Sequence, residues 1–212
     1  SDIRIAWNTV SVIDPLFTIP ILFLVVVAAI KKNPWLARIA LIWAVIYPSL
    51  GLLQHERAVA IGHQIAKERG HNPTRLEAKP SFANILVWKT VYEYDNHFYV
   101  DAVRVGSETK IFTGSKAAKL DINKDFPWLD KNSQQAKDIE RFRWFSIDYL
   151  AIDPDNQYRV IDVRYSMVPN QISPLWSIDL SPTASATEHV KYLTHRDASG
   201  DRLSIFKNIL FD

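Results

Sequence analysis

The stretch LFTIPILFLVVVAAI at residues 16–30 has no charged side chain in 15 consecutive positions. With the apolar residues just before it, at positions 10–13, it reaches about 20 residues, the length that an α-helix needs to cross a ~30 Å hydrocarbon layer at ~1.5 Å per residue. Pro15 suits the first turn of such a helix, where its missing N–H costs nothing. Pro20 lies further in and is expected to bend the helix. The stretch therefore predicts a membrane-spanning helix.

A second apolar run follows at residues 39–53, interrupted by Pro48 and Gly51. Between the two runs lie the sequence KKNP at 31–34 and Trp35, an aromatic residue of the kind that gathers at membrane interfaces. A single run of ~15 apolar residues would also fit a buried helix of a soluble protein. Two runs in tandem, joined by a short basic turn, favour a two-helix transmembrane hairpin over that alternative.

After residue 53 the pattern becomes amphipathic, with apolar residues near helical spacing as far as Arg69. Gly70 is suited to end the helix, and Pro73 follows it. We therefore expect residues 1–70 to form the membrane hairpin with a helical extension, and residues 71–212 to form a soluble domain. The chain starts at Ser1, and no cleavage site follows the first apolar run, so we expect the natural protein to continue upstream.

The charges are distributed unevenly along the chain. Residues 1–53 carry two acids and four bases, whereas residues 54–212 carry 21 of each. The net charge of +2 and the absence of a long basic run argue against a nucleic-acid partner. The sequence has no cysteine, which excludes disulfides, thiolate zinc ligands and cysteine nucleophiles.

The pattern of residues 71–212 predicts an α+β domain. Two β-rich runs, at 85–94 and 98–105, flank Asp95 and Asn96, a pair that favours a tight hairpin turn. Residues 133–146 have one apolar side and predict a helix capped by Asp130 or Asn132. Further strands are expected at 158–165, 175–180 and 189–194, and residues 71–80 are expected to be a linker. Strands on both sides of one helix favour a mainly antiparallel β-sheet with at least one packed helix.

Two ionisable residues mark the outer ends of the predicted hairpin. Asp14 opens the first span and His55 leaves the second, so spans of similar length would bring both to one membrane face. An ionisable group at a bilayer boundary is a functional candidate, and Asp and His are ligands that suit zinc or manganese. The alternative is structural, with Asp14 as a helix N-cap and His55 as an interfacial residue. The two together fall short of the three or four ligands of a complete metal site.

The other motifs carry little chemistry. His63 and His71 do not fit a metal-binding spacing such as His-Glu-x-x-His, and we expect surface positions for them. The stretch ERFRWF at 140–145 has Arg and aromatic residues that can grip a phosphate or a headgroup, but a half-buried helix face has the same composition. The sequence contains no P-loop, dinucleotide-binding glycine pattern or Gly-x-Ser-x-Gly elbow. Catalytic residues therefore stay unknown from the sequence.

Several blocks spread over nearly the whole chain resemble the YdjM-type family of bacterial inner-membrane metal-dependent hydrolases. The blocks are WNTVSVIDPLFTIP at 7–20, LQHERA at 53–58, KPSFAN at 79–84, YVDAVRVG at 99–106, DFPWL at 125–129, ERFRWF at 140–145 and VIDVRYS at 160–166. As a group they are specific, although none is a catalytic signature by itself.

The resemblance implies a fold relation to zinc-dependent phospholipase C and P1-type nucleases, and hydrolysis by a water that a divalent metal, expected to be zinc, activates. It also implies that most metal ligands lie on helices upstream of Ser1. Asp14, in the Ile-Asp-Pro block, is the one residue that carries over as a site residue, and His55 lies in another matching block. The substrate stays open, with a phosphoester or a lipid-like molecule as candidates.

These observations define the expected location and partners. The basic turn that contains Lys31, Lys32 and Arg38 favours a cytoplasmic position for that end of the hairpin in a bacterial inner membrane, with the soluble domain outside. Arg57, Lys67 and the bases after them weaken this orientation signal. The expected partners are the bilayer and upstream helices of the same protein. Two alternatives remain: a non-enzymatic membrane-tethered domain that binds a protein or a lipid, and a soluble protein with a buried helical hairpin.

Overall fold

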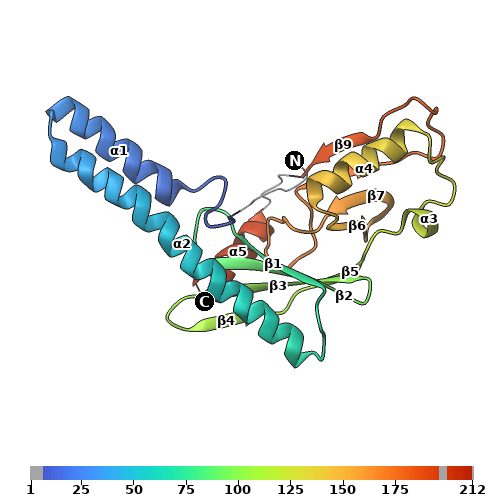
Figure 1. Ribbon diagram of the computed structural model, residues 1–212, viewed down its shortest axis with the longest axis horizontal. Helices are drawn as coiled ribbons and strands as arrows, with labels where there is room; N and C mark the ends of the chain where they lie inside the picture. Colours follow the sequence, from blue (N-terminus) through green and yellow to red (C-terminus); the bar gives the residue numbers. More distant parts are fainter. Residues whose placement is uncertain (1–6, 196–199, 212) are drawn as a thin grey trace.

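The computed structural model describes residues 7–195 and 200–211. Within these residues the protein has an α+β fold with five helices and two antiparallel sheets. Helix α1 (Pro15–Lys31) and the first half of helix α2 (Pro34–Glu68) form an arm that projects from the domain containing the sheets (Figure 1). The predicted α+β class is therefore confirmed.

Local sequence explains both ends of helix α1. The Asp14 carboxylate accepts a hydrogen bond from the Phe17 backbone N–H at 3.2 Å, and Pro15 occupies the first helical position. The helix ends where Lys32 adopts the left-handed conformation, with a φ of 49°. The next residue, Asn33, already caps α2, because its side-chain oxygen accepts the Trp35 N–H at 3.0 Å. Two residues thus suffice to connect α1 to α2.

Helix α2 is continuous over 35 residues, although Pro48 and Gly51 lie inside it. Its first half lies beside α1, where the indole N–H of Trp43 donates to the Leu16 carbonyl at 3.2 Å. The helix ends at Glu68, and Gly70 follows with a φ of 72°. The predicted extension of this helix to about Arg69 is confirmed.

The first sheet lies under the second half of α2. It contains β1 (Arg75–Pro80), β2 (Val87–Tyr94), β3 (His97–Val105), β4 (Thr109–Phe112) and β5 (Lys116–Ala118), in the order β1-β2-β3-β4, with β5 also paired to β3. The predicted hairpin is confirmed, because β2 and β3 pair antiparallel and both Asp95 and Asn96 have positive φ values, as a type I′ turn requires. The predicted linker at residues 71–80 is wrong in part, because residues 75–80 form edge strand β1.

Packing on this sheet joins the arm to the domain. Ala58 and Ile65 of α2 share a buried cluster with Ala78, Trp88 and Val103, which lie on one face of the sheet. Since α2 is unbroken from its first turn to this contact, burial of its second half also orients its first half.

The second sheet contains β6 (Leu150–Asp153), β7 (Asn156–Asp162), β8 (Trp176–Asp179) and β9 (Lys191–Thr194), in that order. Helix α4 (Gln134–Ser146) covers its outer face, with Ile139 and Phe142 packed against Leu150 and Val160. The helix and three of these strands lie where the sequence predicted them. The predicted cap is wrong: the Ser133 hydroxyl accepts the Ala136 N–H and caps α4, whereas the Asp130 side chain accepts the Asn132 N–H before the helix begins.

The two sheets face each other across an apolar layer. Val91, Phe98 and Val100 of the first sheet pack there against Ala151 and Ile161 of the second. The layers therefore run α2, first sheet, second sheet, α4. The short helix α3 (Ile122–Asp125) precedes α4, and helix α5 (Gly200–Phe211) packs on the first sheet through Ile209.

Candidate functional site

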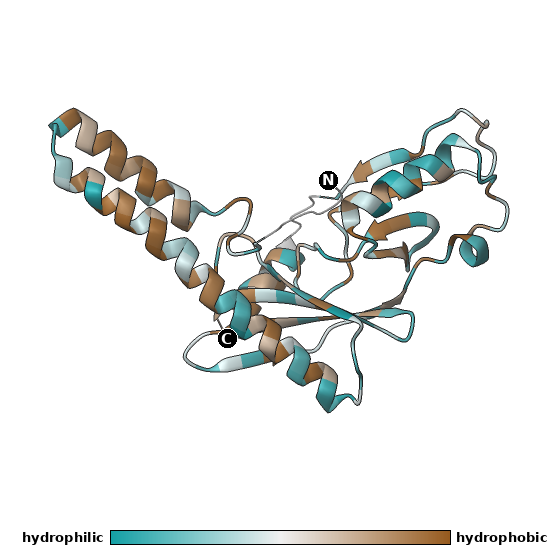
Figure 2. Ribbon diagram, in the orientation of Figure 1, coloured by the Kyte–Doolittle hydropathy of each residue, from teal (hydrophilic) through white to brown (hydrophobic). Residues whose placement is uncertain are grey.

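The arm presents an apolar surface to its surroundings. In Figure 2, α1 and the first half of α2 are mostly brown, whereas the domain has mixed colours. Sixteen large apolar side chains between residues 16 and 53 are exposed, each by 44 to 75%. They are Leu16, Ile19, Leu22, Phe23, Val25, Val26, Ile30, Trp35, Ile39, Leu41, Ile42, Val45, Ile46, Leu50, Leu52 and Leu53.

Among the described residues, one helix is long and apolar enough to cross a membrane. It is α2, and only 17% of its most apolar 18-residue window is buried inside the protein. The core helix of a soluble protein would be mostly buried. Helix α1 is also apolar, but with 17 residues it is one residue shorter than that window.

Asp14 lies at the base of the arm, where α1 begins. Its side chain is 4% exposed, and its second carboxylate oxygen accepts a hydrogen bond from the Tyr47 hydroxyl of α2 at 2.9 Å. The Tyr47 ring also stacks on Phe17, with the ring centroids 5.7 Å apart. The carboxylate therefore caps α1 and joins it to α2. The apolar run at 39–53 contains this tyrosine, and its phenol hydroxyl in such a run was the available signal for a polar partner.

His55 lies elsewhere on α2. Its Nδ1 is 3.3 Å from a carboxylate oxygen of Glu56, and its ring meets the Trp88 ring edge-on, with the centroids 5.7 Å apart. It follows Tyr47, the partner of Asp14, by eight residues, which is about 12 Å along the helix axis. The structure thus gives Asp14 and His55 separate partners.

The described residues do not form a metal site on their own. No group of three or more His, Cys, Asp or Glu side chains in residues 7–195 and 200–211 is arranged to hold an ion. Asp14 has hydrogen-bond donors on both of its oxygens, and His55 faces Glu56 and an indole. The Asp14 carboxylate and the His55 imidazole would supply one or two metal ligands, which is fewer than a zinc site requires.

Lys89 is a buried cation that the sequence analysis missed. Its side chain lies between the sheets, and its Nζ donates to the Ser166 hydroxyl and to the Gln171 carbonyl, each at 2.8 Å. Burial lowers the pKa of Lys89 to about 7, although the nearby Asp162 carboxylate favours the charged form. A single charged residue, Lys89, in the otherwise uncharged strand at 87–92 was the available signal.

A serine hydroxyl hydrogen-bonded to a lysine can act as a nucleophile when the lysine is its base, so Ser166 and Lys89 are a candidate pair. In this protein the Ser166 hydroxyl donates to the Val168 carbonyl at 2.7 Å, so its proton is already directed away from Lys89. The chain Lys89–Ser166–Val168 therefore ties the loop after β7 to the first sheet. A buried ion pair between Arg164 and Asp162, at 2.7 Å, lies near Lys89. The Arg164 guanidinium also donates to the Phe145 carbonyl.

A second polar cluster lies at the end of α2. Arg69 binds Asp101, which is fully buried, through two hydrogen bonds of 2.7 and 2.8 Å. Its guanidinium also donates to the Tyr92 hydroxyl, which lies 2.9 Å from Nδ1 of His71, and the His71 ring stacks on Tyr94. Burial raises the pKa of Tyr92. His71 is thus partly exposed and takes part in this cluster, whereas His63 is exposed as expected.

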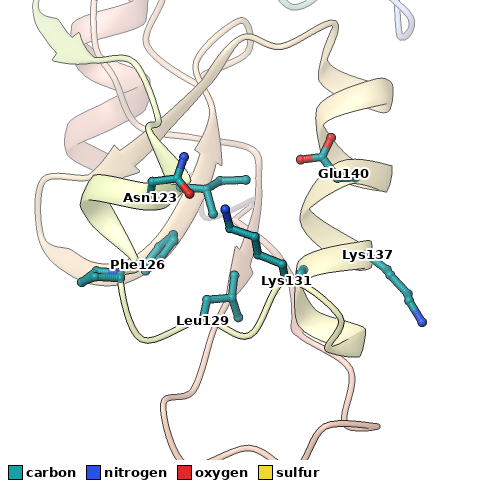
Figure 3. Close-up of a pocket in the computed structure, with 9 residues that line it drawn as sticks. Asn123, Phe126, Leu129, Lys131, Lys137 and Glu140 are labelled. Atoms are coloured by element: carbon teal, nitrogen blue, oxygen red, sulfur yellow. The ribbon is translucent and has the colours of Figure 1, made fainter.

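A hollow with a volume of about 590 Å³ lies between α3 and α4. Its walls include Phe126 and Leu129, and Lys131 and Glu140 stand on its rim (Figure 3). The lining has no nucleophile beside a base and no cluster of metal ligands, so it offers shape without a reactive group.

Comparisons with family models, with curated proteins and with solved structures found no match to this chain.

Proposed function

We propose that α1 and the first half of α2 cross a lipid bilayer as a two-helix hairpin, and that the domain at 71–212 is held at the membrane face by the second half of α2. The observation that carries this proposal is the exposed apolar surface of the arm. If each of its sixteen exposed side chains forfeits about 1 kcal/mol of the ~1.5–3 kcal/mol that full burial gives, water contact would cost roughly 15 kcal/mol. That cost is at the upper end of the ~5–15 kcal/mol by which a typical domain is stable, whereas lipid would remove it.

The bacterial inner membrane is the proposed location, with the domain outside the cytoplasm. Lys31, Lys32 and Arg38 surround the connection between α1 and α2, and the Arg38 guanidinium lies 4.7 Å from the centre of the Trp35 ring. Bases beside a short loop favour the cytoplasmic side, and Trp favours the interface. Both preferences agree with a connection at the cytoplasmic surface.

Cysteine labelling tests the span and its orientation, because residues 1–212 contain no cysteine that would compete for the label. We expect an impermeant maleimide to label Lys131→Cys in intact spheroplasts, and Ala37→Cys only after permeabilisation. Both positions are exposed. Ala37 lies in the first turn of α2 and Lys131 lies between α3 and α4, and Figure 1 shows the start of α2 and helix α3 at opposite ends of the molecule. Labelling of both without permeabilisation would contradict the span, and the reverse pattern would contradict only the orientation. Extraction by alkaline carbonate is the second test, since an integral protein stays in the membrane pellet.

We further propose that the full-length protein is a metal-dependent hydrolase that acts at the membrane face on a phosphoester or a lipid-like substrate. The resemblance to the YdjM-type family supports this proposal, and so does the position of Asp14, a nearly buried carboxylate at the base of the arm. In this proposal Asp14 supplies one ligand to zinc and the upstream helices supply the other ligands. The sequence also suggested an assisting role for His55, but that residue lies further along α2 with partners of its own.

Metal analysis of the full-length protein tests the hydrolase proposal. We expect bound zinc or manganese in the wild type and less of it in Asp14→Asn, which keeps the shape of the side chain. Tyr47→Phe is the matched control, because it removes the hydrogen bond to Asp14 and leaves the carboxylate. A full-length protein without metal would favour the alternative, a non-enzymatic membrane-tethered domain that binds a protein or a lipid. In that case Asp14→Ala would leave the cellular phenotype unchanged.

A further inference from the structure

Two segments that are far apart in the sequence meet at the base of the arm. One is the segment at 7–13 before α1, and the other is the loop at 81–86 between β1 and β2. Figure 1 shows both between the arm and the sheets, beside the middle of α2. The meeting point is therefore where the chain passes from the arm into the domain.

Specific contacts hold the two segments there. Lys79, at the end of β1, donates to the side-chain oxygen of Asn8 at 3.1 Å. The backbone of Thr9 passes so close to α2 that a Cβ on Gly51 would lie 2.1 Å from the Thr9 carbonyl oxygen. On the other side, Gln54 of α2 donates to the Val105 carbonyl at 2.7 Å. The Val105 N–H in turn donates to the Leu86 carbonyl, also at 2.7 Å.

The loop at 81–86 is shaped by one side chain. The Asn84 side-chain oxygen accepts the N–H groups of Leu86 and Val87, and its amide donates to the Phe82 carbonyl. Asn84 itself is 4% exposed. The buried Asn84 side chain thus holds the backbone of the loop in one shape. In that shape the Phe82 and Leu86 side chains are exposed.

Large apolar side chains of both segments are exposed at this place. Val12 is 99% exposed, Trp7 is 74% exposed and Phe82 is 54% exposed, and Ile13 and Leu86 are exposed as well. We call these five residues the collar. The collar continues the apolar surface of the arm. Leu52 and Leu53 of α2 are exposed, and they come immediately before Gln54, the residue through which α2 contacts Val105 beside the loop at 81–86.

We infer that the collar dips into the outer boundary of the bilayer, so that the loop at 81–86 is a lipid-contacting part of the domain. The inference rests on the proposed membrane span, which places the base of the arm at the lipid surface. A lipid surface is extended enough to contact the segments at 7–13 and 81–86 at the same time. Trp and aliphatic side chains, as in the collar, are also favoured at the headgroup boundary. The domain is then held by a second contact besides α2, which restricts its tilt against the membrane.

Spin labels on single cysteines test the inference in the full chain, reconstituted into vesicles of phosphatidylcholine and phosphatidylglycerol. The test labels are Phe82→Cys, Leu86→Cys and Val12→Cys, and all three sites are exposed, so the label does not enter the core. Leu22→Cys on α1 is the reference for lipid depth, and Lys131→Cys is the reference for water. The measurement is the ratio of collision with oxygen to collision with a soluble nickel chelate, which increases with depth in the bilayer.

The expected result is a collar ratio several-fold higher than at position 131 and lower than at position 22. A collar ratio equal to that at position 131, with a high ratio at position 22, would overturn the inference and leave the span intact. Collar labels shielded from both reagents would show contact with protein, and this would also overturn the inference. A low ratio at position 22 would instead sink the proposed span itself, so the two failures are distinguishable.

Discussion

At the scale of single residues, Lys89 makes stability depend on pH. In the unfolded chain its pKa is near 10.5, and burial in the folded protein lowers it to about 7. Between these values the unfolded state binds more protons, so the contribution of Lys89 to stability is lowest below about pH 7 and increases as the pH rises toward 10. Lys89→Met should make the pH dependence of stability between pH 7 and 9 flatter than in the wild type.

Urea unfolding of the detergent-solubilised protein at these two pH values measures the difference. The comparison is one of slopes, because Met also removes the hydrogen bonds to Ser166 and Gln171 and changes the absolute stability. Lys131→Met is the matched control at an exposed position and should keep the slope of the wild type. An unchanged slope in Lys89→Met would show that Lys89 remains charged in the folded protein at neutral pH.

The Arg69–Asp101 pair should matter far more than a surface ion pair. Asp101 is fully buried, and it also accepts the Gly114 N–H at 2.9 Å. Arg69→Met would leave the negative charge of Asp101 unpaired, and the loss of one partner of a buried ion pair costs roughly 3–5 kcal/mol. Lys67→Met, an exposed change on the same helix, should alter the free energy of unfolding by less than about 0.5 kcal/mol. Equal unfolding midpoints for the two variants would contradict the importance of this pair.

At the scale of elements, Gly51 decides whether the segment at 7–13 can lie on α2. Ala is the better helix former by ~1 kcal/mol, so Gly51→Ala would stabilise an isolated helix. Here the added Cβ would meet the Thr9 carbonyl oxygen at 2.1 Å, and backbone cannot yield as a flexible side chain does. We expect a net loss of about 1–3 kcal/mol and a lower unfolding temperature in detergent. Ser49→Ala, at an exposed position two residues earlier, should leave that temperature nearly unchanged.

The elements also show which patterns can be deduced from sequence. The β2–β3 hairpin was predicted, because Asp95 and Asn96 tolerate the positive φ that its turn needs. Strand β1 was missed because its charges resemble those of a linker. Arg75 and Lys79 in fact lie on the inner face of the sheet and are paired there with Glu93 and Glu77. The spacing of residues in the sequence predicts which side chains share a face of a strand. It does not show which charged side chains have an ion-pair partner on the buried face of the sheet.

The candidate site was predictable only in part, for the same reason. The helix-capping role of Asp14 followed from its place before Pro15, and the structure confirms it. Its partner Tyr47 lies 33 residues away, on another helix, and a contact of that range depends on how the helices pack. Lys89 likewise has partners 77 and 82 residues away. Chemistry that depends on such contacts is visible only once the tertiary structure is known.

At the scale of the whole molecule, the central question is which solvent surrounds the arm. A polar substitution in a protein core destabilises the fold, whereas a polar substitution on a lipid-facing surface weakens membrane insertion and leaves the fold in place. Glutamine at six exposed arm positions should lower the need for detergent and leave the domain folded, since these side chains lie outside the domain and are 46 to 66% exposed. The positions are 22, 23, 26, 41, 42 and 45.

Size-exclusion chromatography without detergent and near-ultraviolet circular dichroism measure the two effects. The six-fold variant should give a larger monomeric share than the wild type, with the same spectrum from the folded domain. The control replaces Ala28 and Ala40 by glutamine, because these residues are buried, at 8% and 3% exposure. It should keep the need for detergent and disturb the packing of the arm. A wild-type protein that is monodisperse in plain buffer would contradict the span, because a water-exposed arm of this composition would then be stable without lipid.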